Sequence, residues 1–121
     1  MQPFVVWKVK DREYKLKLST SAILNLEGRY KTNLINLLDG TPSLAVMLDI
    51  VHQALQKYEH GIKEKESMEI YDAYLEEGGS QIDLLKDVVM QIFKVSGFFP
   101  KSVAEAMDEK LLEATDKIEN M

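Results

Sequence analysis

The stretch VVWKVKDREYKLKL, at residues 5–18, decides the fold class of the N-terminal part of this chain. Apolar and basic residues alternate along it with a period of two, the pattern of a β-strand that has one buried face and one face in water. The polar run Asp11-Arg12-Glu13 interrupts this alternation and predicts a turn between two strands. The sequence therefore predicts a β-hairpin over residues 4–18.

The two faces of this predicted hairpin differ in their chemistry. The inward face should carry the apolar side chains Trp7, Val9, Tyr14, Leu16 and Leu18. The outward face should carry the lysines Lys8, Lys10, Lys15 and Lys17. These four lysines are candidate residues for contact with another molecule.

The rest of the chain has the three-to-four-residue apolar spacing of amphipathic helices, with capping residues before several of them. Ser19-Thr20-Ser21 predicts a helix start near residue 20, and a short second helix should follow Gly28 and end at Asp39-Gly40. Thr41-Pro42 predicts the start of a helix over residues 43–58, with Leu44, Met47, Leu48, Val51, Leu55 and Tyr58 on its apolar stripe.

A polar loop is expected over residues 59–66, with Ser67 capping a short helix that Gly78-Gly79 ends. Ser80 and Asp83 resemble a capping box that opens a helix to residue 96, with a stripe of Ile82, Leu85, Val89, Ile92 and Phe93. A last helix should cover residues 101–119 and dock only loosely. The prediction is a single mainly α domain over residues 1–121, with a hairpin at 4–18, a helical core at 20–96 and about five or six helices in all.

Composition and charge restrict the classes of function. The chain has 121 residues, no cysteine and a net charge of −5. Seven basic and three acidic residues give residues 1–38 a charge of +4, so residues 39–121 carry −9. An acidic bulk is repelled by phosphate, which argues against nucleic acid as a partner, whereas the split charge suits head-to-tail contact between copies. No apolar run is long enough to span a membrane, and a soluble cytoplasmic protein is expected.

No pattern of catalytic, cofactor-binding or metal-binding residues is present in the sequence. His52 and His60 lack the spacing of a zinc site, and no serine nucleophile or phosphate-binding glycine loop occurs. His52 is expected to be a hydrogen-bonded or solvated residue at the edge of its helix, and the acidic clusters are interpreted as solvated helix faces. The chain is therefore predicted not to be an enzyme and to need no cofactor or metal.

Phe98-Phe99-Pro100 stands out because two adjacent aromatic residues cannot both point inward from a regular helix. Two interpretations remain open. Both rings fill the core at a sharp connection between helices, or one of them is exposed as an anchor for a partner.

The order of these parts resembles the tail assembly chaperones of siphoviruses, the long-tailed siphophages, and of their prophages. The resemblance covers about residues 5–100 and rests on the hairpin, the Leu-Ser-Thr-Ser entry at 18–21, Leu26-Glu27-Gly28, a Leu-rich helix ending in Ala54-Leu55, and the segment IFKVSGFF at 92–99. It implies a small, non-catalytic helical protein that coats the tape-measure protein, keeps it soluble and recruits tail-tube subunits. Such a protein acts in the host cytoplasm and is absent from the mature virion.

Under this interpretation the chain needs surfaces for its client and for further copies of itself. The lysines of the hairpin would meet the acidic helices of another copy in a ring or helical array. Tyr71, Tyr74, Phe98 and Phe99 are the candidate client contacts. One alternative is a structural head-tail connector or tail-completion protein. The other is a DNA-binding regulatory module, against which stands the lack of a helix rich in Arg, Lys, Asn and Gln.

Overall fold

The fold is mainly α-helical, with a two-stranded antiparallel sheet at its N-terminal end, as the sequence predicts. The computed structural model describes residues 3–38, 40–100 and 102–103, so the helix predicted over 101–119 lies almost entirely outside the described residues. The elements in chain order are β1 (Val5–Val9), β2 (Arg12–Leu16), α1 (Thr20–Tyr30), the 3₁₀ helix η1 (Leu34–Leu38), α2 (Leu44–Leu55), α3 (Glu64–Glu76), α4 (Gln81–Asp83), the π-helical turns η2 (Leu84–Val89) and α5 (Met90–Val95).

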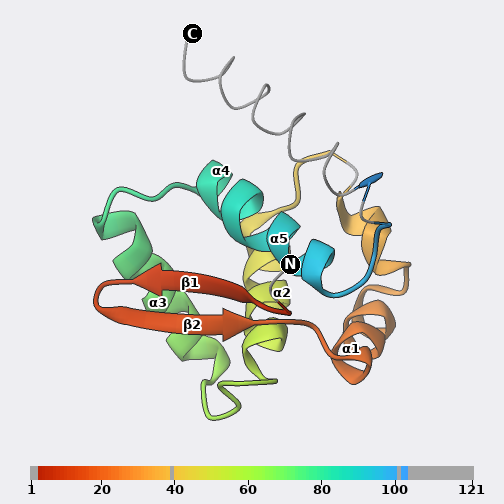
Figure 1. The fold of residues 1–121 in the computed structure, drawn as a ribbon, viewed down its shortest axis with the longest axis horizontal. Coiled ribbons are helices and arrows are strands. Elements are labelled where there is room, and N and C mark those ends of the chain that lie inside the picture. Colours follow the sequence, from red (N-terminus) through yellow and green to blue (C-terminus); the bar gives the residue numbers. More distant parts are fainter. Residues whose placement is uncertain (1–2, 39, 101, 104–121) are drawn as a thin grey trace, which may run out of the picture.

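Four helices, rather than five or six, are formed by the described residues, because α4, η2 and α5 run on as one rod and the predicted short helix after Gly28 is the 3₁₀ helix η1. The hairpin lies across the helices, with β2 packed on α2 and β1 packed on α3 and α5 (Figure 1). No helix within the described residues is long and apolar enough to cross a membrane.

The hairpin has the predicted faces but a tighter turn. Trp7 pairs with Tyr14 and Val9 with Arg12, so the turn consists of Lys10 and Asp11 alone. The predicted turn through Arg12 and Glu13 is therefore wrong. Lys10 has a φ of 56°, and left-handed backbone at this place gives a two-residue turn the twist of its strands. The inward side chains are all buried: Val5, Trp7, Val9, Tyr14, Leu16 and Leu18.

Two helix starts differ from their predicted positions. The hydroxyl of Ser43, not Thr41, accepts the capping hydrogen bond of α2, from the N–H of Val46 at 3.2 Å. Helix α3 begins at Glu64, inside the predicted loop, where the Glu66 carboxylate accepts from the backbone N–H of Lys63 at 3.4 Å. Ser67 is consequently buried within α3 and does not cap it. The caps predicted at residue 19 and at Ser80 are confirmed.

The π-helical turns change which side chains of the last rod are buried. A π turn holds one residue more than an α turn, so it rotates the residues before it relative to those after it. Val88, Val89 and Met90 are buried in succession, and Leu84 is fully buried although the predicted stripe contained Leu85. Ile82, predicted to be in the core, is 41% exposed.

One hydrophobic core joins the hairpin to all four helices. Its largest fully buried side chains are Phe93, Leu16, Leu26, Leu34, Met47, Ile50, Leu55, Leu84 and Ile92. This core holds the surfaces described below in fixed relative positions.

Candidate interaction surfaces

The four lysines of the hairpin do not form one free basic face. The ammonium group of Lys10 lies 3.2 Å from the Glu76 carboxylate, and the backbone N–H of Lys10 donates to the Glu77 carboxylate. Lys8 is opposite Glu13 on the neighbouring strand. Two of the four positions are thus matched by acidic groups of the same chain.

Lys15 and Lys17 lie nearer the open end of the hairpin. Lys15 is exposed, with its ammonium group 5.0 Å from the centre of the Phe4 ring. Lys17 is half-buried, and its backbone N–H donates to the carbonyl of Ala54 at 3.0 Å, which ties the chain after β2 to α2. The structure leaves Lys15 as the most available of the predicted lysines.

Lys15 belongs to a patch that joins the hairpin to the residues after α2, which we call the basic patch: Phe4, Val6, Lys15, Lys57 and Tyr58. The Phe4 and Tyr58 rings meet edge to face with centroids 5.5 Å apart, and the Lys57 ammonium group lies 5.8 Å from the Tyr58 ring centre. Val6 is 39% and Tyr58 37% exposed. The sequence predicts Tyr58 on the core stripe of this helix, but α2 ends at Leu55, so Tyr58 lies beyond the helix and is exposed.

A groove of about 370 Å³ adjoins the basic patch, between β1 and the last rod. It is lined by Phe4, Val5, Val6, Asp87, Gln91, Lys94 and Val95. Burial raises the pKa of Asp87, Lys86 opposes this shift, and the negative charge of Asp83 adds to it. The groove is open to solvent and has mixed charge.

The predicted tyrosine face points inward. Tyr71 is buried, and the half-buried Tyr74 ring packs edge to face on Trp7 with centroids 5.4 Å apart. Burial raises the pKa of both phenols, that of Tyr74 to about 12. Tyr74 therefore fastens α3 to the hairpin, and Tyr71 lies in the core beside it, with the two ring centroids 6.4 Å apart. The expected exposed aromatic face is not present, because the inward face of β1 requires apolar partners.

For Phe98 and Phe99, each of the two interpretations that the sequence left open is partly right. Gly97 ends α5 with a φ of 85°, and the N–H of Phe98 donates back to the carbonyl of Phe93 at 3.3 Å. The Phe98 ring packs edge to face on the Phe93 ring at 4.7 Å, and Phe99 lies against Phe98 at 6.4 Å. Both rings rest on the core, and both remain partly exposed.

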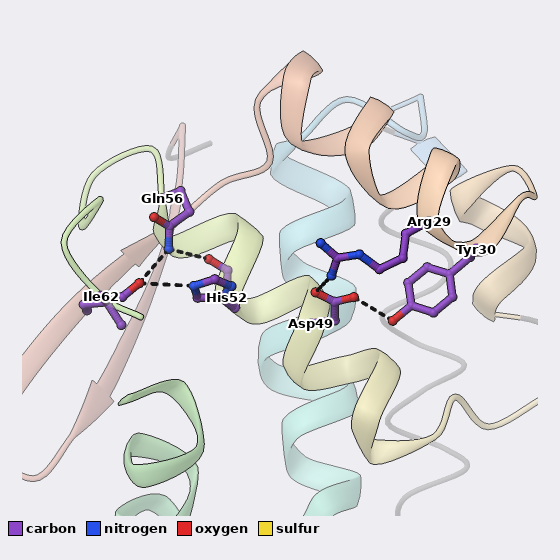
Figure 2. Close-up of polar contacts among 6 residues, drawn as sticks. All are labelled: Arg29, Tyr30, Asp49, His52, Gln56 and Ile62. Atoms are coloured by element: carbon purple, nitrogen blue, oxygen red, sulfur yellow. Dashed lines mark hydrogen bonds and ion pairs between the residues drawn. The ribbon is translucent and has the colours of Figure 1, made fainter. Parts of the chain in front are cut away.

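A polar cluster that the sequence analysis missed joins α1 to α2 (Figure 2). Asp49 is buried on α2, where it accepts a 2.7 Å hydrogen bond from the Tyr30 hydroxyl and forms an ion pair with Arg29. Burial, and then the hydrogen bond to Asp49, raise the pKa of Tyr30 to about 12. An aspartate inside an apolar helix stripe was the one sequence signal for this cluster.

His52 has the structural role expected from the sequence. Its Nε2 atom lies 3.2 Å from the carbonyl oxygen of Ile62, and the side-chain amide of Gln56 donates to the same oxygen at 2.9 Å (Figure 2). These contacts fix the loop between α2 and α3. No group of three or more potential metal ligands occurs among the residues that the structure describes.

Helix α3 carries a surface of the opposite charge, which we call the acidic row: Glu64, Met68, Asp72 and Leu75. Spacings of four, four and three residues place these side chains along one side of the helix. Met68 is 47% and Leu75 41% exposed. At the Glu64 end, a cavity of about 170 Å³ separates α3 from α2.

A family match covers residues 5–119. The chain belongs to DUF6096. The description of DUF6096 is a family of unknown function. No curated protein and no solved structure matches the chain.

On the described part of this DUF6096 chain, three of the surfaces above place apolar side chains in contact with solvent. They are the basic patch, the acidic row and the aromatic pair Phe98–Phe99. Each combines exposed apolar area with a fixed backbone, which suits binding to other protein chains.

Proposed function

We propose that the protein is a non-catalytic tail assembly chaperone of a siphovirus or prophage. It binds the tape-measure protein in the host cytoplasm, keeps its long apolar helices from aggregating and recruits tail-tube subunits. Several copies act along one client. The support comes from the resemblance over residues 5–100 together with the mainly helical fold behind an N-terminal hairpin.

The aromatic pair Phe98–Phe99 is the observation that carries this proposal. A client helix offers a row of apolar side chains, and a partner for it needs partly exposed rings held in place before binding. Phe98 meets this need because Phe93 supports its ring and the Gly97 turn fixes its backbone. Phe99 extends the same apolar surface outward.

The proposal is tested by co-expressing the chain with the tape-measure protein encoded beside it. The wild-type chain should keep the client soluble and co-purify with it. Replacing both Phe98 and Phe99 by alanine should weaken capture by about thirtyfold, the effect of losing an aromatic anchor worth about 2 kcal/mol. Leu24→Ala is the matched control, because Leu24 is an exposed apolar residue on α1.

The single variant Phe99→Ala tests the loss of binding with less effect on folding than the double variant. Phe98 packs on the core residue Phe93, whereas the ring contact of Phe99 is with Phe98. Unchanged client capture by the folded double variant contradicts the role of the aromatic pair, and a client that stays insoluble beside the wild-type chain contradicts the chaperone function itself.

Two further observations separate this function from a connector or tail-completion protein. The gene should lie directly before a very long gene that encodes a helix-rich protein. Mass spectrometry of purified virions should not detect the chain, whereas a structural component would be present in them.

A further inference from the structure

We infer that the basic patch of one copy docks on the acidic row of a second copy, so that copies join head to tail. This inference deepens the proposed function by naming the surfaces through which copies meet along a client. It rests on the charge and exposure of the two surfaces, and it can be tested without any client.

The basic patch has positive charge that no acidic group among the described residues pairs with. Among the described residues, neither Lys15 nor Lys57 forms an ion pair, and each ammonium group instead lies over an aromatic ring. The exposed side chain of Val6 and the edge-to-face pair of Phe4 and Tyr58 supply apolar area between the two cations. A partner for this patch must be acidic and partly apolar.

The acidic row has these properties, because it combines exposed apolar side chains with negatively charged ones. Glu64 and Asp72 flank Met68, and Leu75 continues the line. Neither carboxylate takes part in an ion pair within the part of the chain that the structure describes. Apolar contact at the centre and opposite charges at the rim are the combination that gives protein contacts their specificity.

The turn end of the hairpin, at Lys10 and Arg12, is not part of this contact. Lys10 and Arg12 already pair with Glu76 and Glu59 of their own chain, at 3.2 Å and 3.3 Å. Their charge therefore contributes to holding the hairpin on the helices. Of the four predicted lysines, the proposed contact therefore uses Lys15, and it adds Lys57 from the residues after α2.

The two surfaces share no residue and lie on different elements, which head-to-tail contact requires. The basic patch belongs to the hairpin and the residues after α2, and the acidic row belongs to α3 (Figure 1). Contact between unlike surfaces is heterologous and continues from copy to copy until a ring closes. Both surfaces are small, so the free protein should associate weakly and assemble strongly only when a long client aligns many copies.

Sedimentation velocity over a range of protein and salt concentrations tests the inference. The wild-type chain should self-associate, and high salt should weaken this association. Lys15→Glu with Lys57→Glu, and separately Glu64→Lys with Asp72→Lys, should each weaken it by about tenfold or more. Lys31→Glu is the control, because Lys31 is exposed at the end of α1, outside both surfaces, and it should change association far less than Lys15→Glu alone.

Mixing the two charge-reversed variants is the decisive measurement. The reversed patch of one variant is complementary to the reversed row of the other, and their unchanged surfaces still fit, so the equimolar mixture should regain association. Loss of folding would not be rescued in this way. Met68→Ser with Leu75→Ser gives a second row variant that keeps the charges and should also associate less.

The inference is overturned if the wild-type chain is monomeric at every concentration and salt level, or if the mixture stays monomeric while both variants are folded. It is also overturned if the acidic row proves to bind the client while copies do not associate. Client capture by a monomeric chain would leave the chaperone proposal standing, so the two failures are distinguishable.

Discussion

The ring of Tyr74 meets the indole of Trp7 edge to face, with centroids 5.4 Å apart, and this contact fastens the hairpin to α3. Trp7 is almost completely buried, and its Nε1 atom has no hydrogen-bond partner among the described residues. The hairpin is therefore held by ring packing and apolar burial, not by a hydrogen bond from the indole.

Truncating Trp7 should destabilise the whole fold. Trp7→Ala should lower the free energy of unfolding by about 3–5 kcal/mol, because it removes a large buried ring and leaves a cavity. Trp7→Phe should cost much less, since a ring remains against Tyr74 and the lost N–H has no hydrogen-bond partner among the described residues. Urea unfolding followed by circular dichroism measures both variants. Equal losses for the two would show that the ring contact is not what holds the hairpin.

Gly79 should not tolerate a side chain. A Cβ atom built there would lie 2.6 Å from atoms of the Tyr74 ring, which Trp7 holds from another side. Gly79→Ala should therefore cost about 1–3 kcal/mol through overpacking. Gly28→Ala is the control, because Gly28 lies inside α1 with nothing within 4 Å of the added atom, and it should gain about 0.5–1 kcal/mol. Thermal unfolding should move in opposite directions for the two variants.

Asp49 should be needed for the attachment of α1 to α2. Asp49→Ala removes the acceptor of the Tyr30 hydroxyl and the ion-pair partner of Arg29, and should cost about 1–3 kcal/mol. A double-mutant cycle with Tyr30→Phe should give a coupling energy above about 0.5 kcal/mol, since the two side chains are in direct contact. Additive effects of the two substitutions would contradict the hydrogen bond.

Alkaline pH should destabilise the protein through the half-buried phenols of Tyr30 and Tyr74. The pKa of Tyr30 rises from 10.0 to about 12 in the folded chain, mainly by burial and then by its bond to Asp49. The folded state keeps this proton when the unfolded state has lost it. The contribution to stability is therefore complete below pH 10 and is lost as the pH rises to about 12.

Unfolding in urea at several pH values, with tyrosinate absorbance as a second probe, measures this loss. Tyr30→Phe should flatten the alkaline part of the curve, and adding Tyr74→Phe should flatten it further because Tyr74 has the same shift. An unchanged slope in the double variant would assign the alkaline loss to other groups.

Local sequence patterns were sufficient for the hairpin faces and for the helix caps at residue 19 and Ser80. These features depend on neighbours within a few residues, so period and capping chemistry predict them. The start of α3 was placed too late because Glu66 caps it from inside a polar run that resembles a loop. The stripe of the last rod was shifted because π-helical turns are set by packing and leave no residue signal.

The candidate surfaces needed information that is not local. The pairing of the two strands places Phe4 near Lys15, but Tyr58 lies far from both in the sequence, and only the packing of the hairpin on α2 brings it into the same patch. Tyr71 and Tyr74 face inward because α3 packs against β1 and the core. The pattern of an amphipathic helix shows that these residues share an apolar face, but it does not show whether another element covers that face.

The sequence by itself determined the mainly α class, the inward and outward faces of the hairpin, and the separation of basic from acidic parts of the chain. Those properties follow from residue type and short-range spacing. The tertiary structure decided which charges remain unpaired, because it brought Lys10 to Glu76 and left Lys15, Lys57, Glu64 and Asp72 at the surface. Charge pairing depends on distances between residues remote in the chain, and only the folded core sets those distances.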